Sequence, residues 1–224
     1  MLDYTLVKKA EELHGHICPF LILGLRASEI AMQRLGVRKA GVEETIGEEI
    51  LAIIECNNCF ADGVQVATGC TLGNNSLVYL DVGKNAVTLV RRGEWKGVRV
   101  YVDSEKIRER YFGREARELF EKVVVRREGS REDSERLHKM WSEIGLSMMN
   151  ISEEVFKVEE VMVSEIERAP IFESVKCEVC GELTMKTRAH TVNGKTVCLG
   201  CLGECEAVVG RGIVPNFKIP LKRK

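Results

Sequence analysis

Two C-x2-C pairs near the C-terminal end, Cys177/Cys180 and Cys198/Cys201, are separated by 17 residues. This spacing is typical of a structural zinc site, because four thiolates can close a tetrahedron around Zn²⁺. Asn193-Gly194 lies between the pairs and predicts a hairpin turn that delivers the second pair. Two disulfides or inert buried thiols are the alternative interpretation. The motif therefore predicts a small module folded around a metal ion, without indicating an activity.

The length and composition limit the rest of the chain. A chain of 224 residues is one medium domain or a domain with a small module, and 45% hydrophobic residues can form a core without disulfides. Nine cysteines, an odd number grouped in short motifs, favour metal or redox chemistry in a reducing cytoplasm. The first residues do not resemble a signal peptide, and no apolar run reaches the roughly 18 residues of a membrane span. We therefore expect a cytoplasmic protein with no membrane partner.

The charge balance argues against a dedicated nucleic-acid binder. There are 33 basic and 34 acidic residues, for a formal net charge of −1. Proteins that bind nucleic acid usually carry a basic excess, because contacts with phosphates dominate their affinity. Only the tail, residues 218–224, is locally basic, and a solvated terminus explains it equally well.

Hydrophobic periodicity and turn residues predict an α+β core. We expect helices over residues 2–13, 19–35 and 59–68, and a charged helical segment over 105–150 with a break at 129–130. We expect strands over 49–55, 77–82, 86–92, 98–102 and 155–166. Ala169-Pro170 is a candidate hinge. The sequence thus predicts a core domain over residues 1–168 and a zinc-finger domain over 169–224.

The segment His14-Gly15-His16-Ile17-Cys18-Pro19 carries the densest chemistry of the core. If Pro19 is the first residue of a helix, Cys18 is its N-cap, where the helix dipole favours a thiolate. In an extended segment His14, His16 and Cys18 alternate, so all three can face one point. The alternative is a helix cap beside exposed histidines. We interpret the cluster as a candidate metal site, with Cys18 as a ligand or a nucleophile.

A second polar group follows the strand predicted at 49–55. Cys59, Asp62 and Gln65 recur every three residues after the predicted N-cap Asn58, so they share one helical face. On an otherwise apolar helix such a stripe is expected to face a pocket. Metal binding or catalysis is the favoured interpretation. A redox pair of Cys56 with Cys59 and a purely structural role are the alternatives.

Several motifs together resemble the FmdE family, named for a component of the molybdenum/tungsten formylmethanofuran dehydrogenase. The resemblance covers about residues 10–165 and rests on motifs that agree in order and spacing: His14-Gly15-His16-x-Cys18-Pro19, Cys59-x2-Asp62-x2-Gln65, Thr68-Gly69-Cys70-Thr71-x-Gly73-Asn74 and Asp81-x-Gly83-Lys84. The four C-terminal cysteines resemble the zinc finger, of treble-clef or ribbon type, that some members append.

The resemblance implies a mixed sheet with packed helices that forms an intertwined homodimer. It also implies a cavity that holds a second metal ion of unknown identity. Carried over by position, His16, Cys18 and Cys59 are the first ligand candidates, followed by His14 and Asp62. Cys18 and Cys59 are then ligands or nucleophiles, and Asp62 is a base or the partner of a ligand.

The expected function follows from the family. The resemblance implies a metal-binding accessory or FmdE-like component linked to formylmethanofuran dehydrogenase metabolism, with dehydrogenase subunits as partners. It does not imply the catalytic component, since nothing here resembles a pterin-binding domain and the cysteines lack ferredoxin spacing. The alternative is a metal-sensing or regulatory protein whose finger contacts protein or nucleic acid. The acidic residues Glu178 and Glu182 in the finger favour a protein.

Overall fold

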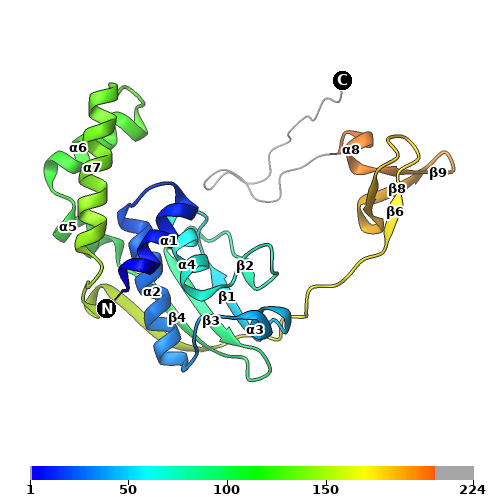
Figure 1. Cartoon of the computed structure of the whole chain (residues 1–224), viewed down its shortest axis with the longest axis horizontal. Helices are drawn as coiled ribbons and strands as arrows, with labels where there is room; N and C mark the ends of the chain where they lie inside the picture. Colours follow the sequence, from blue (N-terminus) through cyan, green and yellow to red (C-terminus); the bar gives the residue numbers. More distant parts are fainter. Residues whose placement is uncertain (1, 205–224) are drawn as a thin grey trace. The chain divides into compact units, whose positions relative to one another are not determined.

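The computed structural model describes residues 2–204, and the chain divides into two compact units, residues 1–166 and 167–224 (Figure 1). The basic tail at 218–224 lies outside the described residues. Within the described residues, no helix is both long enough and apolar enough to cross a bilayer.

A five-stranded mixed sheet in the order β2-β1-β3-β4-β5 forms the base of the larger unit. Its strands are β1 (Ile50–Ile54), β2 (Leu77–Tyr79), β3 (Ala86–Arg91), β4 (Lys96–Val102) and β5 (Phe156–Met162). β1 and β2 are parallel and every other neighbouring pair is antiparallel. The predicted α+β class with a mixed sheet is confirmed.

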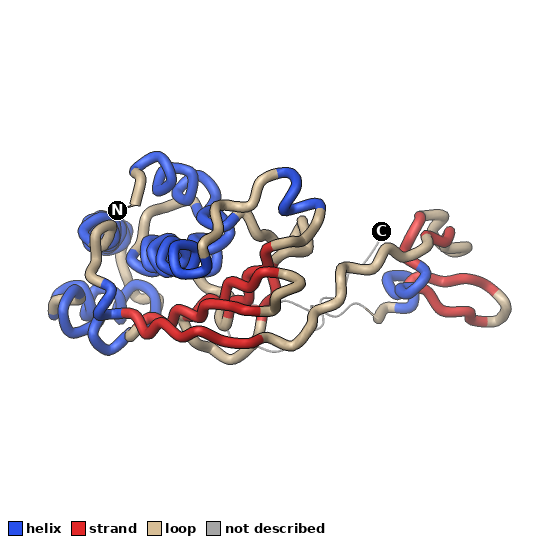
Figure 2. Tube along the Cα trace, turned by 90° about the horizontal axis from the view of Figure 1, so that it is seen from below, coloured by secondary structure: helices blue, strands red, loops and turns tan. Residues whose placement is uncertain are grey.

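The helices begin and end at residues whose chemistry favours those positions. They are α1 (Tyr4–His14), α2 (Pro19–Leu35), α3 (Val42–Ile46), α4 (Cys59–Thr68), α5 (Ser104–Tyr111), α6 (Arg114–Phe120) and α7 (Arg131–Ser147). Cys18 is the N-cap of α2, and Asn58 caps α4 by accepting a hydrogen bond from the Phe60 amide, as predicted. Figure 2 shows the strands of this unit on one side and helices on the other.

The main core lies between the sheet and α2, which also packs against α4. Fully buried side chains fill it: Leu21, Ile22, Leu25, Phe60, Val64, Leu89 and Val100. On the opposite sheet face, Leu51, Ile53 and Val90 form a smaller cluster that Trp95, Val163 and Ile166 partly cover. β1 is therefore covered on both faces, which explains its uninterrupted apolar sequence.

Helices α2 and α4 approach each other through two glycines. A Cβ atom on Gly24 would lie 2.2 Å from the Phe60 carbonyl oxygen, and one on Gly63 would lie 2.3 Å from the Leu21 carbonyl oxygen. Both neighbouring atoms belong to the backbone, so neither can move aside without shifting a helix. The crossing therefore requires glycine at both positions.

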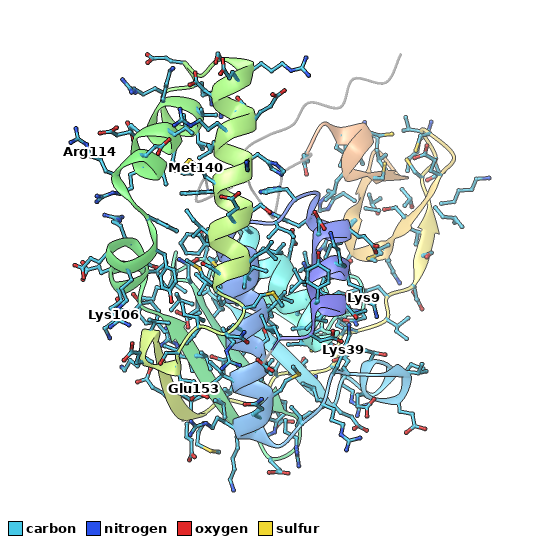
Figure 3. The ribbon with its side chains drawn as sticks, turned by 60° about the vertical axis from the view of Figure 1, so that its left-hand side comes forward. Lys9, Lys39, Lys106, Arg114, Met140 and Glu153 are labelled. Carbon is cyan, nitrogen blue, oxygen red and sulfur yellow. The ribbon has the colours of Figure 1, made fainter. Side chains whose placement is uncertain are left out.

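The segment between β4 and β5 differs from its prediction. The break at Ser130 is present, but a second break at Phe112-Gly113 separates α5 from α6, and residues 121–125 form a π-helix, η1 (Glu121–Val125). Gly113 is the N-cap of α6, a role that the charged sequence around it did not reveal. We call residues 104–147, from α5 to α7, the helical arm. Figures 1 and 3 show α6 and α7 side by side, and Figure 3 shows Lys106 and Arg114 pointing outward from α5 and α6.

The smaller unit contains two hairpins and a short helix. β6 (Ser174–Lys176) pairs with β7 (Leu183–Met185), and β8 (Ala189–Val192) pairs with β9 (Lys195–Cys198) before α8 (Leu199–Leu202). A 3₁₀ turn, Lys186–Arg188, links β7 to β8, and another, Glu153–Val155, precedes β5 in the larger unit. Asn193 and Gly194 have φ angles of 52° and 77°, which fits the predicted hairpin turn.

Replacing Gly24 by alanine should lower the free energy of unfolding of the larger unit by about 1–3 kcal/mol or more, because the added methyl group meets backbone. Gly73→Ala is the matched control: its Cβ would have only the Thr71 Oγ1 atom at 4.0 Å, so the change should stay within about 0.5 kcal/mol. Urea unfolding followed by circular dichroism measures both. Equal unfolding midpoints for Gly24→Ala and the unsubstituted chain would refute the proposed close crossing.

Candidate metal centre and adjoining cavity

The four C-terminal cysteines converge in the smaller unit. Their Sγ atoms all lie within 4.8 Å of one another. The Cys177 and Cys201 sulfurs are 3.9 Å apart, and those of Cys180 and Cys198 are 4.0 Å apart. Zn–S bonds of about 2.3 Å in a tetrahedron place sulfurs about 3.8 Å apart. The donor set and its spacing therefore fit Zn²⁺.

Backbone amides prepare the first of these cysteines for a metal. Hydrogen bonds from the amides around Cys180 and Cys198 lower the pKa of Cys177 to about 6. The Cys198 amide, for example, donates to the Cys177 sulfur over 3.4 Å. Because zinc binds the thiolate, this arrangement reduces the proton competition that the ion must overcome.

In the larger unit His14, His16 and Cys18 form a second cluster. One donor atom from each lies within 4.8 Å of the others. His14 ends α1, and Gly15 follows it with a φ of 89°, a left-handed conformation that turns the chain at once toward Cys18. The sequence-predicted ligands His14, His16 and Cys18 therefore lie together.

Asp62 and Gln65 hold His14 in position. The Nδ1 atom of His14 lies 2.7 Å from the Asp62 Oδ2 atom, and the Gln65 side-chain amide donates to the other Asp62 oxygen over 3.1 Å. With its Nδ1 proton donated to Asp62, His14 directs the Nε2 lone pair to the other side. There it lies 4.0 Å from the Cys18 sulfur, close to the ~3.6 Å separation of nitrogen and sulfur ligands on one tetrahedral Zn²⁺.

Cys59, at the first turn of α4, stands beside this cluster. The Cys18 side chain is the main cause that lowers the pKa of Cys59, to about 6. The contact with Cys59 and burial raise the pKa of Cys18. The Phe20 and Leu21 amides at the start of α2 lower the pKa of Cys18, as the N-cap position predicts, but the contact with Cys59 and burial outweigh them. In the metal-free protein these directions favour the thiolate on Cys59 over Cys18.

Cys56 is not part of this group. It is buried, its thiol donates to the Asn58 side chain over 3.5 Å, and burial raises its pKa to about 11. Because Cys56 is engaged with Asn58 and Cys59 interacts most strongly with Cys18, the structure does not favour a Cys56–Cys59 redox pair.

A cavity of about 1030 Å³ opens beside the cluster. Its lining residues come from the cluster, from the first turns of α4 and α5, and from the rest of the helical arm: Gly15, His16, Cys18, Phe20, Asn58, Cys59, Ser104, Arg108, Phe112, Arg117, Phe120, Glu121, Val124, Ser134, Leu137, His138 and Trp141. Asp62 and His14 are not among them. His16, Cys18 and Cys59 therefore face the cavity, while Asp62 acts on the cluster from behind.

Sequence reasoning missed His138 and the aromatic wall of the cavity. The His138 ring, on α7, lies 6.1 Å from that of His16, centroid to centroid. Burial first, and then the neighbouring His14 and His138, lower the pKa of His16, so its ring stays neutral and able to bind a metal. A lone histidine in a charged helix carried no sequence signal. Its role depends on how the arm folds back.

Both units are similar to known protein families. Residues 13–157 match the model of a family described as "FmdE, Molybdenum formylmethanofuran dehydrogenase operon". Residues 170–206 match the "Prokaryotic dksA/traR C4-type zinc finger". A crystal structure of a tungsten formylmethanofuran dehydrogenase FmdE-like protein from Syntrophus aciditrophicus superposes with a TM-score of 0.58 at 27% identity, covering 88% of this chain and 90% of that one.

A curated relative is also similar in sequence. The "probable S-adenosyl-L-methionine-binding protein" of Archaeoglobus fulgidus is 62% identical over 209 residues, which make up 93% of this chain and 56% of that protein. The chain therefore spans only a little over half the length of this relative.

Replacing Cys177 by alanine should remove one zinc ion per chain and unfold the smaller unit, because three sulfurs no longer close the tetrahedron. Cys70→Ala is the control, since the Cys70 thiol is buried in the main core and donates to the Ile50 carbonyl, outside both clusters. Zinc per chain is measured by plasma mass spectrometry. An unchanged zinc content in Cys177→Ala would contradict the tetrahedral site.

In metal-stripped protein the alkylation rate of Cys59 should rise through a midpoint near pH 6, since its pKa is lowered from 9.0 to about 6. Cys18→Ala should move that midpoint to higher pH, because the thiolate loses a hydrogen-bond donor. Mass spectrometry of the Cys59 peptide after iodoacetamide treatment gives the profile. Cys56, with its raised pKa, is the internal control and should stay unlabelled at pH 7. A Cys59 midpoint near pH 9 would show that the contact does not exist.

Proposed function

Because this chain belongs to the FmdE family, we propose that it is a metal-binding FmdE-like protein whose core cluster holds a second ion, beside the zinc of the smaller unit. We further propose that it serves as an accessory component in formylmethanofuran dehydrogenase metabolism. The observation that supports the core site is the convergence of His14, His16 and Cys18 at a cavity, with Asp62 orienting His14.

The donor chemistry limits the identity of the second ion. Two imidazoles with one or two thiolates suit Zn²⁺ or another borderline-soft transition metal and do not suit Mg²⁺ or Ca²⁺. A bound ion of this kind would act as a Lewis acid toward a ligand in the cavity. His16, Cys18 and Cys59 line the cavity, so an ion held by them would be within reach of a ligand there.

Asp62 is proposed as a positioning residue and not as a base. Both of its carboxylate oxygens are engaged, one with His14 and the other with Gln65. It does not line the cavity and so does not face a substrate. Its contribution is to fix the tautomer and orientation of His14, which increases the ligand's basicity.

The partners are proposed from the relatives. The Syntrophus protein is named as an FmdE-like protein of a tungsten dehydrogenase, and on that basis dehydrogenase subunits are the proposed partners. A second copy of this chain is proposed from the family resemblance alone. We do not propose that this chain binds S-adenosylmethionine. The Archaeoglobus name describes a protein of which this chain covers 56%, and the binding can belong to the remainder.

Regulation through the zinc finger is a second candidate. Val179, Leu183 and Met185 are exposed on the smaller unit, with 62%, 74% and 55% of their surfaces accessible. Apolar side chains of this size on so small a module favour contact with a protein over contact with nucleic acid. Under this second proposal the core cluster senses the metal ion and the zinc finger contacts a partner protein.

The core site is tested by metal analysis. We expect two ions per chain, and Asp62→Asn should weaken the binding of one of them about 10- to 100-fold while the zinc of the smaller unit stays bound. Asp81→Asn is the control, because this exposed carboxylate accepts from Tyr79 and takes no part in the cluster. Competition with a chromophoric chelator measures the affinity. One ion per chain, or equal affinities of Asp62→Asn and the unsubstituted protein, would overturn the proposal.

A further inference from the structure

We propose that the cavity beside the core cluster binds a ligand with a planar aromatic or heteroaromatic ring joined to a carboxylate or phosphate group. The proposal deepens the proposed function, because it names the ligand class of the same site, and it rests on that function only for what the metal does to the ligand. Binding itself depends on the helical arm. At about 1030 Å³ the cavity is as large as the sites of drug-sized ligands and cofactors.

The walls of the cavity present aromatic faces from three parts of the chain. The Trp141 ring lies 5.0 Å from that of Phe112 and 5.4 Å from that of Phe120, and both pairs are within about 30° of parallel. Phe20, on α2, meets Phe112 edge-on at 6.5 Å. None of the four is fully buried, so each keeps surface that a ligand can cover. Such a group favours a flat ring, which stacks on it with little loss of conformational entropy.

The charged groups of the same wall favour an anion. Arg108 on α5 and Arg117 on α6 line the cavity, and within residues 2–204 neither guanidinium has a hydrogen bond or an ion pair. Other arginines of the arm are paired: Arg110 with Glu154, and Arg114 with Glu118. An arginine fork matches the two oxygens of a carboxylate or phosphate.

One carboxylate offsets part of this charge. Glu121 is the only acidic residue among the described residues that line the cavity. The basic residues of the same lining are Arg108, Arg117 and the exposed His138. The part of the lining that the helical arm supplies therefore carries a positive excess even when His138 is neutral, and Cys59, at the start of α4, lies outside that part. An acidic ligand is favoured over a cationic one.

The backbone of the wall is irregular where it meets the cavity. Glu121 and Val124 belong to η1, which follows α6 directly. A π-helical turn is rare and is found mostly at functional sites, because it shifts the following side chains out of the α-helical phase. Val124, four residues after Phe120, lines the same wall.

Isothermal titration calorimetry with three matched probes tests the ligand class. 2-Naphthoate carries the ring and the charge, 2-naphthalenemethanol keeps the ring without the charge, and cyclohexanecarboxylate keeps the charge without the aromatic ring. We expect 2-naphthoate to bind the full chain at least tenfold more tightly than either of the others. 2-Naphthyl phosphate is the fourth probe, and the tighter of the two anions identifies the acidic group.

Variants of the arm locate the binding. Arg108→Gln with Arg117→Gln should weaken the binding of 2-naphthoate about tenfold or more and leave that of the alcohol unchanged, because only the anion uses the guanidinium groups. Trp141→Leu should weaken both aromatic probes severalfold, and Phe120→Leu repeats this test if Trp141→Leu does not fold. Arg114→Gln is the control. Arg114 is on α6, like Arg117, but its side chain points outward (Figure 3), is paired with Glu118 and does not line the cavity.

The outcomes separate this proposal from the proposed function. The double arginine variant should show the same loss in metal-stripped and in metal-loaded protein, whereas Asp62→Asn should change metal binding alone. If 2-naphthoate binds no tighter than the alcohol and the saturated acid, or if its affinity is the same in the double arginine variant as in Arg114→Gln, the ligand class is wrong even if two ions are found.

Discussion

The close crossing of α2 and α4 is the contact on which the candidate site depends. Gly24 and Gly63 let the two backbones meet where any Cβ atom would strike a carbonyl oxygen. Each helix begins a few residues earlier with a cysteine, Cys18 as the N-cap of α2 and Cys59 as the first residue of α4. Because the helices touch at the glycines, these two starting points lie together, and Cys18 lowers the pKa of Cys59 while Cys59 raises that of Cys18.

The polar face of α4 explains the arrangement around that pair. Its three members, Cys59, Asp62 and Gln65, lie about one turn apart. Gln65 donates to Asp62, and Asp62 orients His14. Cys59, at the start of the same face, reaches Cys18. The polar residues that recur every three positions along α4 thus connect this helix to the histidine–cysteine cluster.

Sequence reasoning was most effective where local chemistry determines structure. Pro19 after Cys18, and Asn58 before Cys59, place the starts of both helices, and Gly36 and Gly69 end them with left-handed φ angles. The convergence of the four zinc-finger cysteines, and that of His14, His16 and Cys18, could likewise be predicted from their spacing in the sequence. The roles of His138, Trp141 and Arg117 were not, because they depend on a fold-back of the arm over a cluster more than 90 residues away in sequence. The second break, at Gly113, and the π-helix could not be predicted, because the charged sequence around them is typical of one long solvated helix.

The register of β4 with β5 has a consequence for how this protein can vary. Val102, the last residue of β4, pairs with Phe156, the first of β5, so the chain leaves the sheet for the arm and returns to it at adjacent positions. The helical arm is thus an insertion between two paired neighbouring strands. The outer part of the arm can therefore differ in length without altering the strand order. Its two ends cannot, because Ile107 belongs to the main core and Gly145 lies against the Cys18 backbone.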